Sequence, residues 1–127
     1  MPIQHYLDGD ILRVEFIGIV TNEEFAGMAT AVTHLESVGP VVPHRIADLS
    51  QCTQLDFQYP AILALAQLRK SMKFTNSFKS AIVTTTPVQA GMARMFVALN
   101  NHPQITIRIF PDMETARKWI DEAVSPA

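Results

Sequence analysis

The stretch RIADLSQCTQLDFQYPAILAL, residues 45–65, decides the fold class of this 127-residue chain. An apolar run ends in Asp48-Leu49-Ser50, and a polar segment then separates it from an apolar pattern with helical spacing. This order predicts a buried strand over 44–49 and a helix over about 57–73. Ligands of open α/β sheets bind outside the carboxyl ends of the strands, so the polar segment is the expected functional region.

Hydrophobic periodicity places the other elements on both sides of this stretch. It predicts strands over 3–7, 11–17, 80–84 and 105–109, and helices that begin at the capping residues Thr21, Thr86 and Asp112. The Asp-Gly pair at positions 8 and 9 indicates a hairpin between the first two strands. The order β-β-α-β-α-β-α-β-α predicts one α/β domain over residues 1–127, with a mostly parallel five-stranded sheet, one antiparallel N-terminal hairpin neighbour and four helices.

Composition excludes several function classes. Hydrophobic residues make up 48% of the chain and charged residues only 17%, so a dimer contact or a ligand groove is expected to cover part of the apolar surface. The longest basic run is Arg69-Lys70 and the net charge is −2, which argues against nucleic-acid binding. There is no apolar stretch of ~18 residues and no signal-peptide pattern, and Cys52 is the only cysteine. These features predict a cytoplasmic protein without membrane insertion or an internal disulfide.

Polar side chains gather where two predicted strands end. Asp48, Ser50, Thr53 and Asp56 follow one strand, and Thr84, Thr85 and Thr86 follow the next. One interpretation is a binding or docking edge, with the threonines and a helix N-terminus forming an anion site. The other is local, because Asp and Thr commonly cap helices and bind loop amides; Asp56 would then cap the helix over 57–73.

No catalytic or metal-binding constellation is present in the sequence. The histidines at positions 5, 34, 44 and 102 are scattered, and none has metal-ligand spacing to another. Cys52 has no base or orienting partner nearby in the sequence. We therefore expect no enzyme activity, no metal and no cofactor.

The helix over 57–73 is apolar on nearly all sides from Ala61 to Leu68. Such a helix is either enclosed by the protein or covered by something else. Together with the Met-rich helix that follows, it could form the core, accept an acyl chain or contact a second subunit. The candidate residues for this apolar groove or dimer contact are Ile62, Leu65, Met92, Met95 and Phe96.

The chain resembles the STAS domain, the module shared by sulfate transporters and anti-sigma-factor antagonists. Members carry a strand ending in Asp-Leu-Ser, then a Thr, then Asp-Ser-Ser-Gly at the start of the next helix. Here Asp48-Leu49-Ser50, Thr53 and Asp56 match those positions without a gap. The C-terminal pattern with Phe110 and Trp119-Ile120 is similar to divergent SpoIIAA-like (STAS/SEC14) bacterial proteins. The resemblance covers the whole chain and implies a regulatory domain that binds a partner.

One segment departs from this family. Phe57-Gln58-Tyr59 replaces Ser-Ser-Gly, so an amide stands where the antagonists carry the serine that a partner kinase phosphorylates. Phosphorylation would place about two negative charges at a helix N-terminus. Because the Gln58 amide cannot accept a phosphoryl group, we predict that this switch is absent.

The sequence thus supports two hypotheses. The first is a non-enzymatic STAS-like homodimer that engages a protein partner or an apolar small ligand through the polar edge: Asp48, Ser50, Thr53, Asp56, Gln58, Tyr59, Thr84 and Thr86. The alternative is a lipid or acyl-ligand carrier of SEC14-like character. That alternative requires a continuous apolar cavity between the second and third helices.

Overall fold

A five-stranded sheet forms the centre of the computed structural model, which describes residues 3–56 and 58–122. The elements are β1 (Ile3–Asp8), β2 (Ile11–Thr21), α1 (Asn22–Val38), β3 (His44–Asp56), α2 (Tyr59–Ser71), β4 (Phe78–Val83), α3 (Pro87–Leu99), β5 (Ile105–Phe110) and α4 (Met113–Asp121). The strands lie side by side in sequence order. β1 is antiparallel to β2, and the remaining neighbours are parallel. This confirms the predicted fold class.

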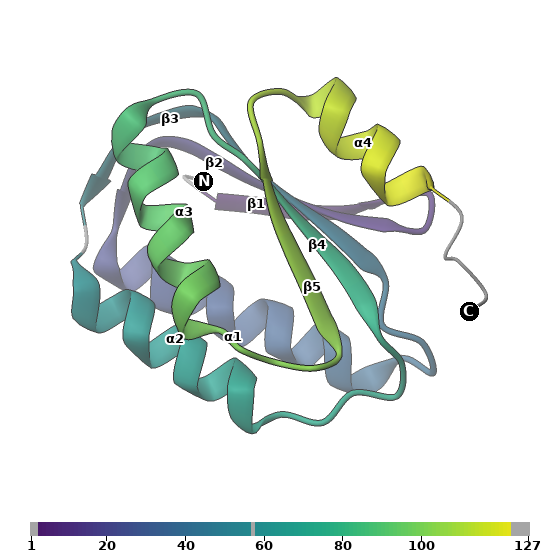
Figure 1. Ribbon diagram of the computed structural model, residues 1–127. Coiled ribbons are helices and arrows are strands. Elements are labelled where there is room, and N and C mark those ends of the chain that lie inside the picture. Colours follow the sequence, from purple (N-terminus) through teal and green to yellow (C-terminus); the bar gives the residue numbers. More distant parts are fainter. Residues whose placement is uncertain (1–2, 57, 123–127) are drawn as a thin grey trace.

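The helices cover the two faces of the sheet unequally. Figure 1 shows α1, α2 and α3 together on one face and α4 on the opposite face. Each of the first three helices connects neighbouring parallel strands, and right-handed crossovers in one direction place them all on the same side. The main core therefore lies between the sheet and α1–α3, with Val14, Phe16 and Ile62 among its buried residues. A smaller core joins Trp119 of α4 to Ile46 and Ala81 on the other face.

The structure confirms the predicted turn at Gly9 and the predicted helix caps at Thr21, Thr86 and Asp112. Gly9 has a φ of 65° in the β1–β2 turn, a conformation that favours glycine. Thr21 and Glu24 form the predicted capping box at the start of α1. Thr86 and Asp112 accept hydrogen bonds from backbone amides at the N-termini of α3 and α4.

The third strand is longer than the sequence predicts, and the next helix is shorter. β3 runs to Asp56, whereas β4 pairs with it only as far as Asp48. The extra residues are held by β2, which itself continues to Thr21 and pairs with β3 up to Asp56. The pairing of β2 with β3 contains two register shifts. Gly18 in β2, with a φ of 67°, lies at one of them.

The prediction that Asp56 caps the helix over 57–73 is consequently wrong. Asp56 still belongs to β3, and α2 spans Tyr59–Ser71 with Gln58 at its N-cap position. The Gln58 side chain makes no capping hydrogen bond, and Pro60 lies in the first turn, where a missing N–H is tolerated. Within the described ranges, no helix combines the length and apolar character needed to cross a bilayer.

Candidate functional site

The overhang of β3 and the start of α2 bring five of the predicted polar-edge residues onto the surface. These residues, here named the β3 rim, are Ser50, Thr53, Asp56, Gln58 and Tyr59, and all are exposed. The Tyr59 side chain is 46% exposed. The β3 rim is therefore a polar surface with one aromatic side chain, built from adjacent elements of the chain.

The three other predicted edge residues have local contacts. The Asp48 carboxylate is buried and accepts a hydrogen bond of 2.9 Å from the Ser50 backbone N–H. Thr84 is buried, and its backbone N–H donates to the Phe110 carbonyl at 3.0 Å. Thr86 is exposed, but its hydroxyl accepts from the Gln89 backbone N–H at 3.2 Å. Each of these residues therefore has a hydrogen bond with nearby backbone, and that of Asp48 is to Ser50 of the β3 rim.

Gln89 supports the overhang and was missed by the sequence analysis. Its side-chain amide is buried in α3 and donates to the carbonyls of Leu49 and Cys52, each at 3.0 Å. Its Oε1 accepts from the Thr85 backbone N–H at 2.8 Å. One side chain thus satisfies groups on β3 and on the β4–α3 loop. Nothing in the local spacing around Gln89 indicates such a long-range role.

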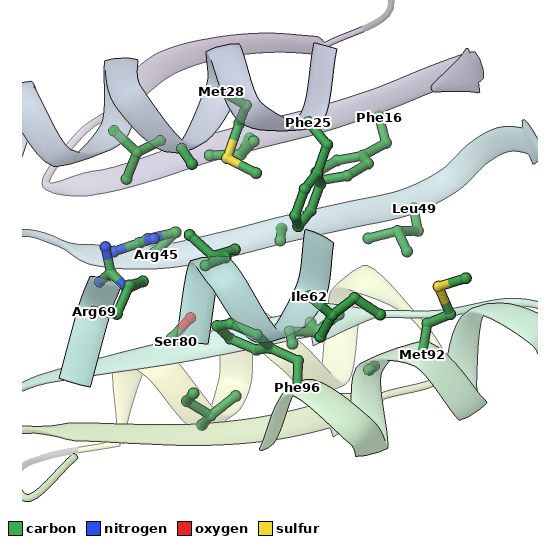
Figure 2. Close-up of a pocket in the computed structure, with 18 of the residues that line it drawn as sticks. Phe16, Phe25, Met28, Arg45, Leu49, Ile62, Arg69, Ser80, Met92 and Phe96 are labelled. Carbon is green, nitrogen blue, oxygen red and sulfur yellow. The ribbon is translucent and has the colours of Figure 1, made fainter. Parts of the chain in front are cut away.

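An apolar cavity of about 110 Å³ lies between the sheet and helices α1, α2 and α3. Its walls come from all three helices and from strands β2 to β5, and Figure 2 shows how their side chains surround it. Of the residues predicted for an apolar groove, Ile62, Leu65, Met92 and Phe96 line this cavity. Met95 does not line it and is 37% exposed on α3. The cavity is therefore formed against the sheet rather than between two helices alone.

A buried group of three charged residues closes one end of the cavity. The Glu36 carboxylate on α1 accepts two hydrogen bonds from the Arg69 guanidinium on α2, at 2.6 and 2.8 Å. It also accepts one from Arg45 on β3. Arg45 and Arg69 both line the cavity, and their guanidinium groups lie over the Phe78 ring at 5.7 and 6.0 Å. Burial and the neighbouring Arg69 lower the pKa of Arg45 to about 9, so it stays charged at neutral pH.

The sequence contains a signal for two members of this charged group. Glu36 follows Phe25, Ala29 and Val32 at helical spacing, so periodicity places it on the buried face of α1. Arg69 follows Ile62 and Leu65 in the same way on α2. A charged residue at such a position needs a buried partner. The identity of that partner is a tertiary property.

An open groove of about 400 Å³ runs along the outer surface between α1 and α2. Four alanines are among the residues that line the groove: Ala26, Ala29, Ala61 and Ala64. Phe25, Ala29 and Leu65 line both this groove and the cavity. Their side chains therefore form the wall between the cavity and solvent.

Two buried titratable side chains outside this site, Cys52 and His102, have hydrogen-bond partners. The Cys52 thiol is buried, and burial raises its pKa, so the reactive thiolate is disfavoured. The His102 ring contacts the Met72 carbonyl at 2.6 Å through Nε2 and accepts from the Gln104 N–H at 3.0 Å through Nδ1. Over residues 3–56 and 58–122, no three His, Cys, Asp or Glu side chains lie close enough to hold a metal ion.

Comparison with known proteins identifies the fold. No family model matches the chain, and no curated protein matches its sequence. The structure is similar to that of an uncharacterised DUF3478 family protein with a SpoIIAA-like fold from Shewanella loihica PV-4. The TM-score is 0.59 at 19% identity, over 93% of this chain and 91% of that chain. The chain therefore has the SpoIIAA-like fold, which is the STAS fold, as the sequence resemblance predicts.

A second solved structure shares a weaker likeness. It is the complex of the diguanylate cyclase SiaD with its activator SiaC from Pseudomonas aeruginosa. The TM-score is 0.46 at 15% identity, over 85% of this chain and 90% of that chain.

Proposed function

We propose that this chain is a non-enzymatic binding domain that engages a protein partner through the β3 rim. The observation that carries the proposal is the overhang of β3 beyond its last β4 partner, Asp48. A strand edge without a neighbouring strand can bind another chain through backbone hydrogen bonds. The edge offered here begins after Cys52, because Gln89 already binds the Leu49 and Cys52 carbonyls. The exposed Tyr59 adds a large amphipathic side chain of the kind enriched at protein interfaces.

The proposed engagement does not depend on serine phosphorylation. Gln58 occupies the N-cap position of α2, where a phosphate would meet the positive end of the helix. Its amide cannot be phosphorylated, so the proposed rim is permanently in its unmodified state at this position. A second copy of this chain is one candidate partner, in line with the homodimer expected from the sequence.

Photo-crosslinking tests the rim. A benzoylphenylalanine placed at Tyr59 is compared with one at Tyr6, a tyrosine of β1 that is 43% exposed, against 46% for Tyr59. We expect a discrete adduct from the Tyr59 position alone, and we expect Thr53→Arg to abolish it. The partner is then identified by mass, with two chains indicating a homodimer, and its affinity is measured against the wild type and Thr53→Arg. Equal adducts from both tyrosines, no adduct, or an affinity unaffected by Thr53→Arg would refute the proposal.

The cavity supports a second candidate function, the binding of a small apolar ligand. A cavity of roughly 150 Å³ lined by apolar side chains stays dry and binds benzene, and the cavity of this chain is about 110 Å³. Larger ligands occupy pockets of roughly 300–1,000 Å³. We therefore propose a ligand the size of a short chain or a single ring, rather than cargo with a long acyl chain.

Cavity filling tests this second function. Ala93 lines the cavity from α3 and is buried, and leucine is favourable in a helix. Native mass spectrometry with added toluene is expected to show one bound molecule on the wild type and none on Ala93→Leu. Binding that persists in Ala93→Leu would show that the ligand lies elsewhere.

A further inference from the structure

We infer that the ligand of the cavity is a small organic carboxylate whose head group binds Arg45. This inference rests on the small-ligand function proposed above and adds its chemical class. Two observations carry it: the charged group at the end of the cavity has more cations than anions, and one of its donors has no partner.

The charge balance follows from the three buried side chains. Arg45 and Arg69 carry two positive charges, and Glu36 supplies one negative charge to both. All three are buried, with Arg45 9% and Glu36 6% exposed. A buried charge without full compensation is costly, because the surroundings cannot replace its hydration. A bound anion would complete the pairing of two cations with two anions.

The unpartnered donor identifies where the anion would bind. Arg69 uses two nitrogens on Glu36 in a bidentate arrangement, whereas Arg45 uses one. The Arg45 Nε atom is buried and has no hydrogen-bond partner among the described residues. A ligand carboxylate can accept from this Nε–H through one oxygen, while the neighbouring Nη2 already donates to Glu36.

The shape of the cavity sets the rest of the ligand. Figure 2 shows Arg45 and Arg69 at one end and Leu49 and Met92 at the other. Apart from Ser80, the side chains that line the walls between these ends are apolar, so the body of the ligand must be mainly apolar. The whole cavity measures about 110 Å³, so the head group and a single ring or short branched chain together fill it.

The ligand reaches the cavity through the groove between α1 and α2. Phe25, Ala29 and Leu65 belong to both spaces, so rotation of the two larger side chains connects the cavity with the surface. Phe25 is buried and Leu65 is only partly exposed, so this opening requires a transient local rearrangement of α1 and α2.

Calorimetry with a matched pair of probes tests the inference. Benzoate and benzamide have nearly the same shape, and only benzoate is charged. We expect the wild type to bind benzoate at least about 10-fold more tightly, which is the factor supplied by a charge-assisted hydrogen bond. Arg45→Met keeps an unbranched stem, removes the guanidinium and leaves Glu36 paired with Arg69, and we expect it to bind both probes equally.

Three further variants complete the experiment. Arg45→Lys retains a cation and is expected to keep part of the preference for benzoate. Arg94→Met removes an exposed arginine from α3 and is expected to change nothing. Ala93→Leu is expected to abolish binding of both probes.

The outcomes separate this inference from the function on which it rests. Equal affinities for benzoate and benzamide in the wild type would overturn the carboxylate class while leaving the small-ligand function intact. A benzoate preference that survives Arg45→Met would overturn the role of Arg45. Binding that survives Ala93→Leu, or no binding of benzoate, benzamide or toluene, would overturn both proposals.

Discussion

Replacing Glu36 with glutamine is expected to destabilise the fold more than any other change in its charged group. The substitution keeps the size of the side chain but removes the negative charge that, among the described residues, pairs with both Arg45 and Arg69. Two buried guanidinium groups then face each other without a counter-ion. Removing one partner of a buried ion pair costs about 3–5 kcal/mol, a large part of the roughly 5–15 kcal/mol that stabilises a domain.

Arg45→Met is the informative comparison, because it also removes a charge from this group. Glu36→Gln leaves two positive charges without a negative one, whereas Arg45→Met leaves one positive and one negative charge. Glu36 and Arg69 remain as a bidentate pair with distances of 2.6 and 2.8 Å. Burial and the neighbouring Arg69 lower the pKa of Arg45 to about 9, so the fold disfavours this charge. We expect Arg45→Met to change the free energy of unfolding by less than about 1 kcal/mol, since apolar replacements of buried ions are often neutral.

Urea denaturation followed by circular dichroism measures both free energies of unfolding. Unchanged m-values would show that the unfolded states are comparable. Glu122→Gln, at an exposed position after α4, serves as the matched control and should leave the midpoint unchanged. If Arg45→Met destabilises the protein as much as Glu36→Gln, charge balance is not what the group provides and the reasoning fails.

Three further predictions concern other parts of the chain. Gln89→Leu leaves two β3 carbonyls without a donor and should destabilise the fold by about 2 kcal/mol or more, with faster hydrogen exchange at the Thr85 amide. Burial and the nearby Lys79 lower the pKa of His44, so stability should fall as the pH drops below about 6.5, and His44→Asn should remove this dependence. Incubation with ATP and bacterial serine kinases should add no phosphate to residues 57–59, as intact and peptide masses would show.

Each of these predictions has a clear contrary result. Gln89→Glu keeps the acceptor but loses the donor, so stability equal to the wild type would contradict the role of the amide. The expected loss of stability on protonation of His44 also agrees with its hydrogen bond. Its Nδ1 accepts from the Lys79 backbone N–H at 2.9 Å and cannot do so when protonated. If the wild type instead becomes more stable relative to His44→Asn as the pH falls below about 6.5, the prediction is wrong. A phosphate on residues 57–59 would restore the switch that Gln58 is predicted to remove.

Local chemistry explains why much of the fold could be predicted. The turn at Gly9, the capping box from Thr21 to Glu24 and the cap at Thr86 each depend on atoms within a few residues. Period-2 and period-3.6 patterns identify strands and helices for the same reason, since one buried face is enough to specify each element. The order of these elements then restricts the topology.

The end of β3 could not be predicted in this way. Residues 50–56 are polar and look like a loop, but the long β2 strand supplies ladder partners for them up to Asp56. The end of β3 is set by the end of its partner β2. Helix α1 separates these two strands in the sequence, so local patterns cannot reveal the pairing. Because β3 extends to Asp56, α2 begins later than predicted, and Gln58 rather than Asp56 is at the helix N-cap.

By itself, the sequence determined the fold class, the order of the elements, most of their capping residues and the lack of a serine at position 58, because these depend on short segments of chain. Only the tertiary structure decided where the charges and empty space lie. Glu36, Arg45 and Arg69 come from three different elements, and the two partners joined by the bidentate pair are 33 positions apart. Helix periodicity shows that two of these charges are buried, but a cavity and its charge balance exist only where the packed layers meet.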